Sequence, residues 1–367
     1  MFEQSSYREQ IGFFKKLRSF DYILLICIIS IGIISIFSMY STDGGEFLHH
    51  SKSHIIRFVV FFFMMICLSF LNIKIWHYFA YLFYFVVLVA LFWASFYGVK
   101  ASGSQRWINL YFINLQPSEL MKVAIIACLA KFYHRTQLER VNTFQHIFIS
   151  LTILILPIML VVAQPDLGTS ILIALSGIVV MWLSGLNIKY FIYSFITLLV
   201  SLPFVISFLK PYQKLRVLTF LNPDRDPLGA GYQIIQSKIA VGSGGFTGKG
   251  FLKGTQSYLE FLPEKHTDFI FTLFAEEHGF LGSMVLLFIY TIVIYRTLKI
   301  GSISRSYFAK LFCYGYGSAI FFYISVNMCM VLGLLPIVGS PLPIMSYGGS
   351  SMLATMIGFS IVMSAKI

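Results

Sequence analysis

Residues Phe261–Gly279 read FLPEKHTDFIFTLFAEEHG and place a cluster of ionisable side chains at the mouth of an apolar segment. The acids and bases at the end of the polar loop, and the two acids inside the apolar run, are Glu264, Lys265, His266, Asp268, Glu276 and Glu277. Ionisable groups at a membrane entrance are costly, so this cluster indicates a functional site. The alternative is a set of interfacial charges that cap a helix.

The composition predicts an integral membrane protein. The 367 residues are 57% hydrophobic and only 11% charged, whereas soluble domains carry about 25% charged residues. Five cysteines lie in apolar runs with neither CxxC nor zinc spacing, so neither a disulfide framework nor a metal site is expected. The formal net charge of +12 is spread over many loops, which fits membrane orientation and not nucleic-acid binding.

Ten apolar stretches are long enough to cross a bilayer, which needs roughly 20 residues each. We therefore expect an all-α polytopic protein, a single membrane domain over residues 1–367, with one long extracytoplasmic loop at 210–267 between the seventh and eighth spans. The predicted spans are 20–40, 54–72, 77–98, 117–134, 144–163, 167–185, 190–209, 268–297, 308–334 and 342–365.

The distribution of Lys and Arg predicts the orientation. With the N-terminus in the cytoplasm, fourteen basic residues fall in cytoplasmic segments and four in the short outer segments. The four outer residues are Lys52, Arg57, Lys100 and Arg106. This bias indicates that both termini are cytoplasmic and that the 210–267 loop faces outward.

In this orientation the even-numbered spans begin at the outer face. Prolines stand at or near the starts of three of them, at Pro117, Pro165 and Pro341, as is common in a first helical turn. The positive ends of these helices could seat a phosphate or pyrophosphate group. Any even-numbered bundle has this polarity, but ionisable residues lie beside three of the four ends.

Two pairs of residues are candidates for anion binding. Glu119 and Lys122 are three residues apart and share a helix face, so Lys122 could hold an anion or the pair could orient Asp268; the alternative is a buried pair that only fixes packing. Arg106 and Trp107 could bind phosphate and stack on a sugar, or Trp107 could be an interfacial anchor. Asp166 follows Pro165, where a capping acid is ordinary.

Two glycine-rich stretches are also candidates for a functional role. Gly242–Gly250 is not a phosphate-binding loop, because Ser243 and Gly250 stand where that motif needs Gly and Ser or Thr; tight turns or close approach to a ligand explain its glycines better. A break in the last span could line a cavity, and its residues are Ser346, Tyr347, Gly348, Gly349 and Ser350.

Asp268 is the strongest catalytic candidate. It lies at the expected start of the eighth span, at the outer interface, below a polar loop. A carboxylate there could take a proton from an attacking hydroxyl group. The residues alone therefore predict an outward-facing membrane site that binds an anionic ligand, and no more specific function.

Five stretches resemble the SEDS family, the polytopic wall-synthesis proteins of the RodA, FtsW and SpoVE types. They are QPSELMK from Gln116, QPDLGT from Gln164, Asn222–Gln256, Phe261–Gly279, and GLLPIVGSPLPIMSYGGSS from Gly333. Ala275 stands where division-type (FtsW) chains tend to carry Gly, so the resemblance is greatest to the elongation type (RodA).

The resemblance implies a peptidoglycan glycosyltransferase that polymerises lipid II into glycan strands at the outer face of the cytoplasmic (inner) membrane during elongation and rod-shape maintenance. It implies an essential Asp268, and it maps the family's Glu and Lys onto Glu119 and Lys122 and its Arg-Trp loop onto Arg106 and Trp107. Asp166, His266 and Lys265 are further candidates for binding or orienting the substrate. Implied partners are a class B penicillin-binding transpeptidase and other membrane proteins of the elongation machinery. No organic cofactor is expected; a divalent cation (Mg²⁺ or Mn²⁺) could assist, although the sequence contains no dedicated metal cage.

Two other functions remain open from the sequence. A flippase or transporter of the lipid-linked precursor would also carry polar residues inside its bundle, but no inverted repeat or paired interrupted span is present. A non-catalytic scaffold for the transpeptidase would tolerate neutral replacements of Asp268 and Lys122.

Overall fold

The computed structural model describes residues 13–101, 104–109, 114–208, 214, 218–220, 222, 230–255 and 265–366. All of the 256–264 segment, including Glu264, and most of the 210–229 segment lie outside the described residues. Each of the ten predicted spans corresponds to a helix, so the prediction of an all-α polytopic membrane protein is confirmed. These ten helices are α2 (Tyr22–Thr42), α3 (His49–Ser69), α4 (Ile73–Tyr97), α5 (Pro117–His134), α6 (Phe144–Ala163), α7 (Leu167–Leu183), α8 (Ile188–Phe208), α12 (Ile270–Ile303), α13 (Tyr307–Val331) and α14 (Gly349–Lys366).

Shorter elements complete the described fold. They are α1 (Phe13–Arg18), the 3₁₀ turn η1 (Leu138–Arg140), α10 (Ala230–Ser243) and three short antiparallel strands in the order β1-β2-β3: β1 (Val99–Ala101), β2 (Ser104–Asn109) and β3 (Asn114–Leu115). The α10 helix lies within the segment predicted as a long loop. Loops of that length without secondary structure of their own are uncommon in compact domains.

Six described helices are both long and apolar enough to cross a membrane, namely α2, α3, α4, α6, α12 and α13. Helix α5 carries Glu119, Lys122 and Lys131, and α14 is rich in Ser, Thr and Gly. Both of these helices are buried over most of their length. Their polar groups therefore face protein and not lipid, which is where membrane helices tolerate them.

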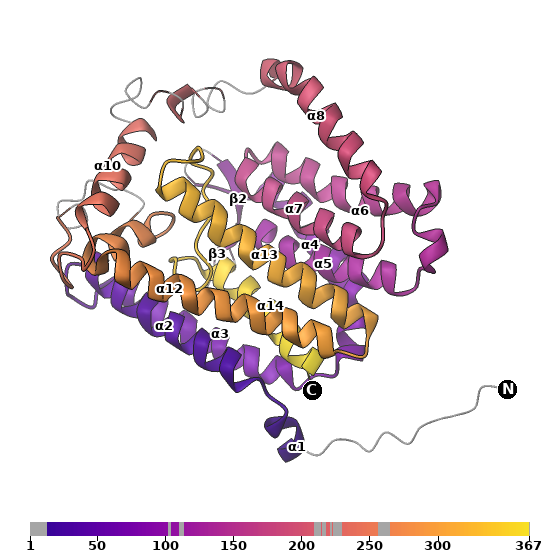
Figure 1. Ribbon diagram of the computed structural model, residues 1–367, viewed down its shortest axis with the longest axis horizontal. Coiled ribbons are helices and arrows are strands. Elements are labelled where there is room, and N and C mark those ends of the chain that lie inside the picture. Colours follow the sequence, from indigo (N-terminus) through magenta and orange to yellow (C-terminus); the bar gives the residue numbers. More distant parts are fainter. Residues whose placement is uncertain are drawn as a thin grey trace.

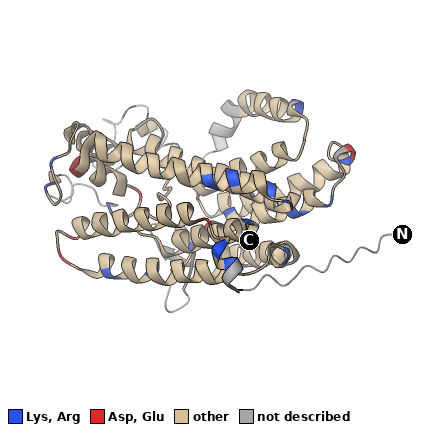
Figure 2. Ribbon diagram, turned by 60° about the horizontal axis from the view of Figure 1, so that its bottom comes forward, with Lys and Arg blue, Asp and Glu red and all other residues tan. Residues whose placement is uncertain are grey.

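Helix α5 lies at the centre of the bundle. It packs against α4, α6, α7, α13 and α14, and it is buried on nearly all sides. Helices α2 and α3 pack on α12 and α14, while α8 lies at the periphery on the opposite side of the bundle (Figure 1). Lys, Arg, Asp and Glu occupy short stretches of helices that are otherwise uncharged (Figure 2).

A buried acid holds together the end of the bundle that carries the C-terminus. Asp21 caps α2 by accepting a hydrogen bond from the Leu24 amide at 3.0 Å, and its carboxylate pairs with Arg296 and, at 3.0 Å, with Lys366. Burial alone would raise the pKa of Asp21, but the hydrogen bonds from Arg296, Leu24 and Lys366 outweigh it and lower that pKa. Asp21 therefore ties α2 to both α12 and α14.

Helix α12 is broken at Gly279, whose φ of 63° and ψ of −161° are not helical. The break frees the carbonyl groups of Glu276 and Glu277, which accept hydrogen bonds at 3.0 Å from the amides of Lys249 and Gly250. The amides of Phe280 and Leu281 are also freed, and they donate to the carbonyls of Gly245 and Phe246 at 2.9 and 3.1 Å. The glycine-rich loop thus satisfies backbone groups that a membrane interior would not hydrate.

The side chains of the paired glutamates strengthen this junction. Glu276 is fully buried and pairs with Lys249 at 2.6 Å, while Glu277 accepts from Ser41 on α2 and from the Leu252 amide. The glycines permit close approach of the loop backbone to α12. An added Cβ at Gly248 would lie 2.1 Å from the Glu277 carbonyl oxygen.

We predict that Gly248→Ala destabilises the protein. Its φ of +83° is costly for alanine by about 1–3 kcal/mol, and the clash with Glu277 adds to that cost. The check is the melting temperature in detergent, with Gly242→Ala as the control, because a Cβ at Gly242 in α10 meets nothing within 4 Å. Equal melting temperatures for the two variants would contradict the proposed role of the loop.

Candidate active site

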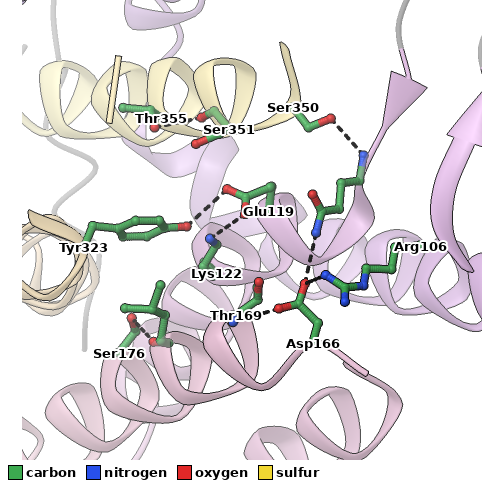
Figure 3. A network of polar contacts seen from close by, with 12 residues as sticks. Arg106, Glu119, Lys122, Asp166, Thr169, Ser176, Tyr323, Ser350, Ser351 and Thr355 are labelled. Atoms are coloured by element: carbon green, nitrogen blue, oxygen red, sulfur yellow. Dashed lines mark hydrogen bonds and ion pairs between the residues drawn. The ribbon is translucent and has the colours of Figure 1, made fainter. Parts of the chain in front are cut away.

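A buried ion pair lies at the start of α5. Lys122 Nζ is 2.7 Å from Glu119 Oε1, and both side chains are at most 4% exposed. Tyr323 of α13 donates a hydrogen bond to Glu119 Oε2 at 3.2 Å, and its ring centroid is 3.9 Å from Lys122 Nζ. Figure 3 shows these three side chains pointing toward one another. The predicted pairing of Glu119 with Lys122 is therefore confirmed.

A cavity of about 20 Å³ adjoins this pair. That volume is close to what one water molecule requires. Its polar lining comes from Glu119, Lys122, Tyr316, Tyr323 and Thr355, and its remaining lining is apolar. The cavity lies between α5, α13 and α14, so the ion pair is the boundary of a small internal space and not part of a continuous apolar core.

Asp268 lies in the turn at residues 265–269, just before α12 begins at Ile270. The sequence predicted that the eighth span begins at Asp268, whereas the helix begins two residues later. Asn327 of α13 donates from Nδ2 to the Asp268 carbonyl at 2.9 Å and to the Ser340 carbonyl at 2.7 Å. Asp268 Oδ2 is 3.6 Å from the position that a Cβ on Gly339 would occupy. The carboxylate of the half-buried Asp268 thus lies near Gly339.

One face of α13 connects the two acidic groups. Tyr323 contacts the Glu119–Lys122 pair and Asn327 holds the turn of Asp268. Residues four apart lie on the same helix face, about 6 Å apart along the axis. The described contacts show no direct bond between Asp268 and Lys122, but α13 positions both on one side of the bundle.

The N-terminal ends of four helices meet here. The Gln116 amide, at the start of α5, donates to Ser350 Oγ of α14 at 2.8 Å, and Gln116 Nε2 donates to Asp166 Oδ2, beside α7, at 3.1 Å. The amide of Tyr347, before α14, donates to the His266 carbonyl, before α12, at 2.8 Å. Hydrogen bonds therefore join the helix ends that the sequence predicted to lie on one face.

Arg106 and Asp166 form the rim of this region. Asp166 caps α7 by accepting from the Thr169 amide at 3.1 Å and pairs with Arg106 at 3.2 Å. Arg106 also donates to the carbonyls of Gln164 and Pro165 at 2.9 and 2.8 Å. The guanidinium therefore binds the connection between α6 and α7. Figure 3 shows its pairing with Asp166. The half-buried Trp107 follows it on β2.

The residues around the start of α14 make hydrogen bonds within the bundle, and they are not among those that line the cavity beside the ion pair. The predicted last span began at 342, but α14 begins at Gly349 because residues 342–348 form irregular backbone within the bundle. Ser346 Oγ accepts from the Leu342 amide at 2.7 Å, and Ser350 Oγ donates to the Asn114 carbonyl at 2.9 Å. The α14 residues that line this cavity are Ala354 and Thr355. That Ser346, Tyr347, Gly348, Gly349 and Ser350 line a cavity stays a prediction.

His266 and Lys265 share the half-buried turn with Asp268. The His266 ring stacks on that of His50, with centroids 4.2 Å apart. Three buried hydroxyl or amide oxygens in this part of the structure lack a hydrogen-bond partner among the described residues: those of Ser118, Asn327 (Oδ1) and Ser340. Unsatisfied buried groups are rare, so these oxygens mark places where water or a polar ligand would be stabilised.

Sequence reasoning missed Tyr323 and Asn327. The sequence did contain a pattern that pointed to them. Polar residues four positions apart inside a predicted span are costly in a membrane and therefore indicate a functional site. The pattern was overlooked because neither residue is charged or belongs to the stretches that carry the family resemblance.

Comparison with known families gives a match over residues 17–367 to the FtsW/RodA/SpoVE family, described as cell cycle protein. Peptidoglycan glycosyltransferase MrdB of Escherichia coli (strain K12) is 45% identical over 77% of this chain and 76% of its own length. MrdB of Helicobacter pylori is 35% identical over 94% and 89%, and a probable peptidoglycan glycosyltransferase FtsW of Buchnera aphidicola is 34% identical over 90% and 84%.

Solved structures agree with these matches. A chain of a peptidoglycan synthase complex that coordinates polymerization and crosslinking has a TM-score of 0.81 and 28% identity, covering 95% of this chain and 97% of its own. The rod shape determining protein RodA of Thermus thermophilus has the same fold, with a TM-score of 0.70 and 22% identity over 95% and 96%. The chain therefore belongs to the FtsW/RodA/SpoVE family, and its similarity is to the RodA type.

Proposed function

We propose that this protein is a peptidoglycan glycosyltransferase of the RodA type that polymerises lipid II into glycan strands during cell elongation. The 45% identity with a protein named peptidoglycan glycosyltransferase supports this activity. The observation that carries the site is the face of α13, on which Tyr323 contacts Glu119 and Asn327 holds the turn of Asp268. It puts a candidate base and a candidate cation on one side of the bundle.

In the proposed reaction the 4-hydroxyl group of the acceptor's GlcNAc attacks C1 of the donor's MurNAc. A new glycosidic bond forms, the bond from C1 to the pyrophosphate oxygen breaks, and undecaprenyl pyrophosphate leaves with the bonding electron pair. Asp268 accepts the proton of the attacking hydroxyl group or orients it. Its half-buried position in a turn gives it access that a carboxylate inside the bundle lacks.

Lys122 and the joined helix ends are the proposed stabilisers of the leaving pyrophosphate. Glu119 holds Lys122 in place, and the unsatisfied oxygens of Ser118 and Ser340 are available for a polar ligand. Arg106 is engaged by Asp166 and two carbonyl groups, so an anion would have to compete for it. Its proposed contribution, with Trp107, is at the rim. Mg²⁺ or Mn²⁺ could share the charge.

We infer that the chain is one membrane domain in the cytoplasmic (inner) membrane with both termini inside and the site outside. The excess of Lys and Arg in the predicted cytoplasmic segments supports that orientation. The likeness to a chain of a synthase complex supports a crosslinking transpeptidase as partner. Other elongation-machinery membrane proteins are further proposed partners.

The first test concerns Asp268. Asp268→Asn keeps the side-chain shape and removes the base, so strand synthesis from lipid II should fall by roughly 10²–10⁴. The assay uses full-length protein purified in detergent, with and without its transpeptidase. Glu46→Gln, at an exposed acid of the α2–α3 turn, is the control and should remain active. Strand synthesis near the wild-type rate in Asp268→Asn would refute the assignment.

A double-variant cycle separates catalysis from packing at the ion pair. If the pair only fixes packing, Lys122→Met should cost about 3–5 kcal/mol, and adding Glu119→Leu should restore both the melting temperature and synthesis. We expect a different result, in which the double variant recovers the melting temperature but not strand synthesis. Recovery of synthesis would show that the reaction does not need Lys122.

A further inference from the structure

Three potential metal ligands meet beside the turn that carries Asp268. They are Asp43, His50 and His266, and one donor atom from each lies within 4.8 Å of the others. Asp43 follows the end of α2 and His50 lies in the first turn of α3, whereas His266 lies more than 200 positions later, before α12. Among the residues that the structure describes, this is the one such group of His, Cys, Asp or Glu.

The donor set indicates the class of ion. Two imidazoles and one carboxylate suit zinc and similar divalent transition metals, as in zinc sites with two His and one acidic ligand. Mg²⁺ and Ca²⁺ prefer oxygen ligands and are poorly served by imidazole. A three-ligand set also leaves a position for water.

One edge of the cluster already has the required spacing. His50 Nδ1 is 3.4 Å from Asp43 Oδ1, and a tetrahedral zinc ion with bonds of about 2.0–2.1 Å holds its ligands about 3.4 Å apart. The rings of His50 and His266 are stacked, 12° from parallel. One ring must turn edge-on for both to coordinate, and the His50 side chain, 41% exposed, has room to do so.

Neighbouring side chains orient the donors. Asp43 Oδ2 accepts from the Ser51 amide at 2.9 Å and from Ser51 Oγ at 2.5 Å, so Oδ1 is directed at His50. Thr42 Oγ1 is 3.0 Å from His266 Nδ1. In natural metal sites, hydrogen bonds of this kind orient the ligating side chains and raise the affinity of the site for the metal.

We propose that Asp43, His50 and His266 bind a divalent transition-metal ion of the zinc class. The ion joins the end of α2 and the first turn of α3 to the turn before α12, and His266 is two residues from Asp268. Binding therefore restrains the backbone that carries Asp268. The site requires no glycosyl transfer, so it stands or falls independently of the proposed function.

The test is metal-dependent thermal stability. Full-length protein in detergent, with any affinity tag removed and metal stripped by chelation, is melted in increasing ZnCl₂ and, separately, MgCl₂. An ion that binds only the folded protein raises the melting temperature in a concentration-dependent way. We expect a rise with Zn²⁺ at concentrations where Mg²⁺ has no effect. Substitution with Co²⁺ should give the visible absorption of a site with nitrogen and oxygen ligands.

Matched variants locate the ion. His50→Ala and Asp43→Asn should lose the response to Zn²⁺, and Ser51→Ala should weaken binding by about 10–100-fold. His49→Ala removes an exposed neighbouring histidine and should respond like the wild type. Each variant is first melted without metal, so that a folding defect is recognised. No response of the wild type, or an unchanged response in both His50→Ala and Asp43→Asn, would overturn the proposal.

Discussion

The buried ion pair between Glu119 and Lys122 is the constraint around which the bundle is arranged. Two charges that are at most 4% exposed are tolerated only if each is paired and hydrogen-bonded. Lys122 has Glu119 and the ring of Tyr323, and Glu119 also has the Tyr323 hydroxyl group. Helix α5 must therefore lie inside a shell of other helices, and its neighbours α4, α6, α7, α13 and α14 supply that shell.

The same requirement applies to the backbone. A helix broken at Gly279 exposes carbonyl and amide groups that lipid cannot satisfy. The 244–250 loop satisfies them with four backbone hydrogen bonds, and its close approach explains why glycine stands at 244, 248 and 279. The glycine-rich loop and the paired glutamates, which are separate features of the sequence, thus form one structural unit at the break in α12.

The candidate site combines a rigid part and an adaptable part. Glu119, Lys122 and Tyr323 project from long buried helices. Asp268 and His266 lie in a half-buried turn held by Asn327 and Tyr347 through backbone groups. In the proposed reaction a substrate with two sugars and a long lipid would contact both parts, and a turn can adjust to it more readily than a packed helix. The cluster of Asp43, His50 and His266 would restrain this turn from the other side.

The sequence by itself determined the fold class and the existence and order of the ten long helices, because apolar stretches of this length have few alternatives in a membrane. It also determined the Glu119–Lys122 pair, since a spacing of three residues on a helix is a local property. The late start of α14, the contacts of Arg106, the link through Tyr323 and Asn327, and the meeting of Asp43 with His266 were decided by the tertiary structure. Each depends on segments far apart in the chain, and a single sequence does not specify which polar groups will satisfy one another across a bundle.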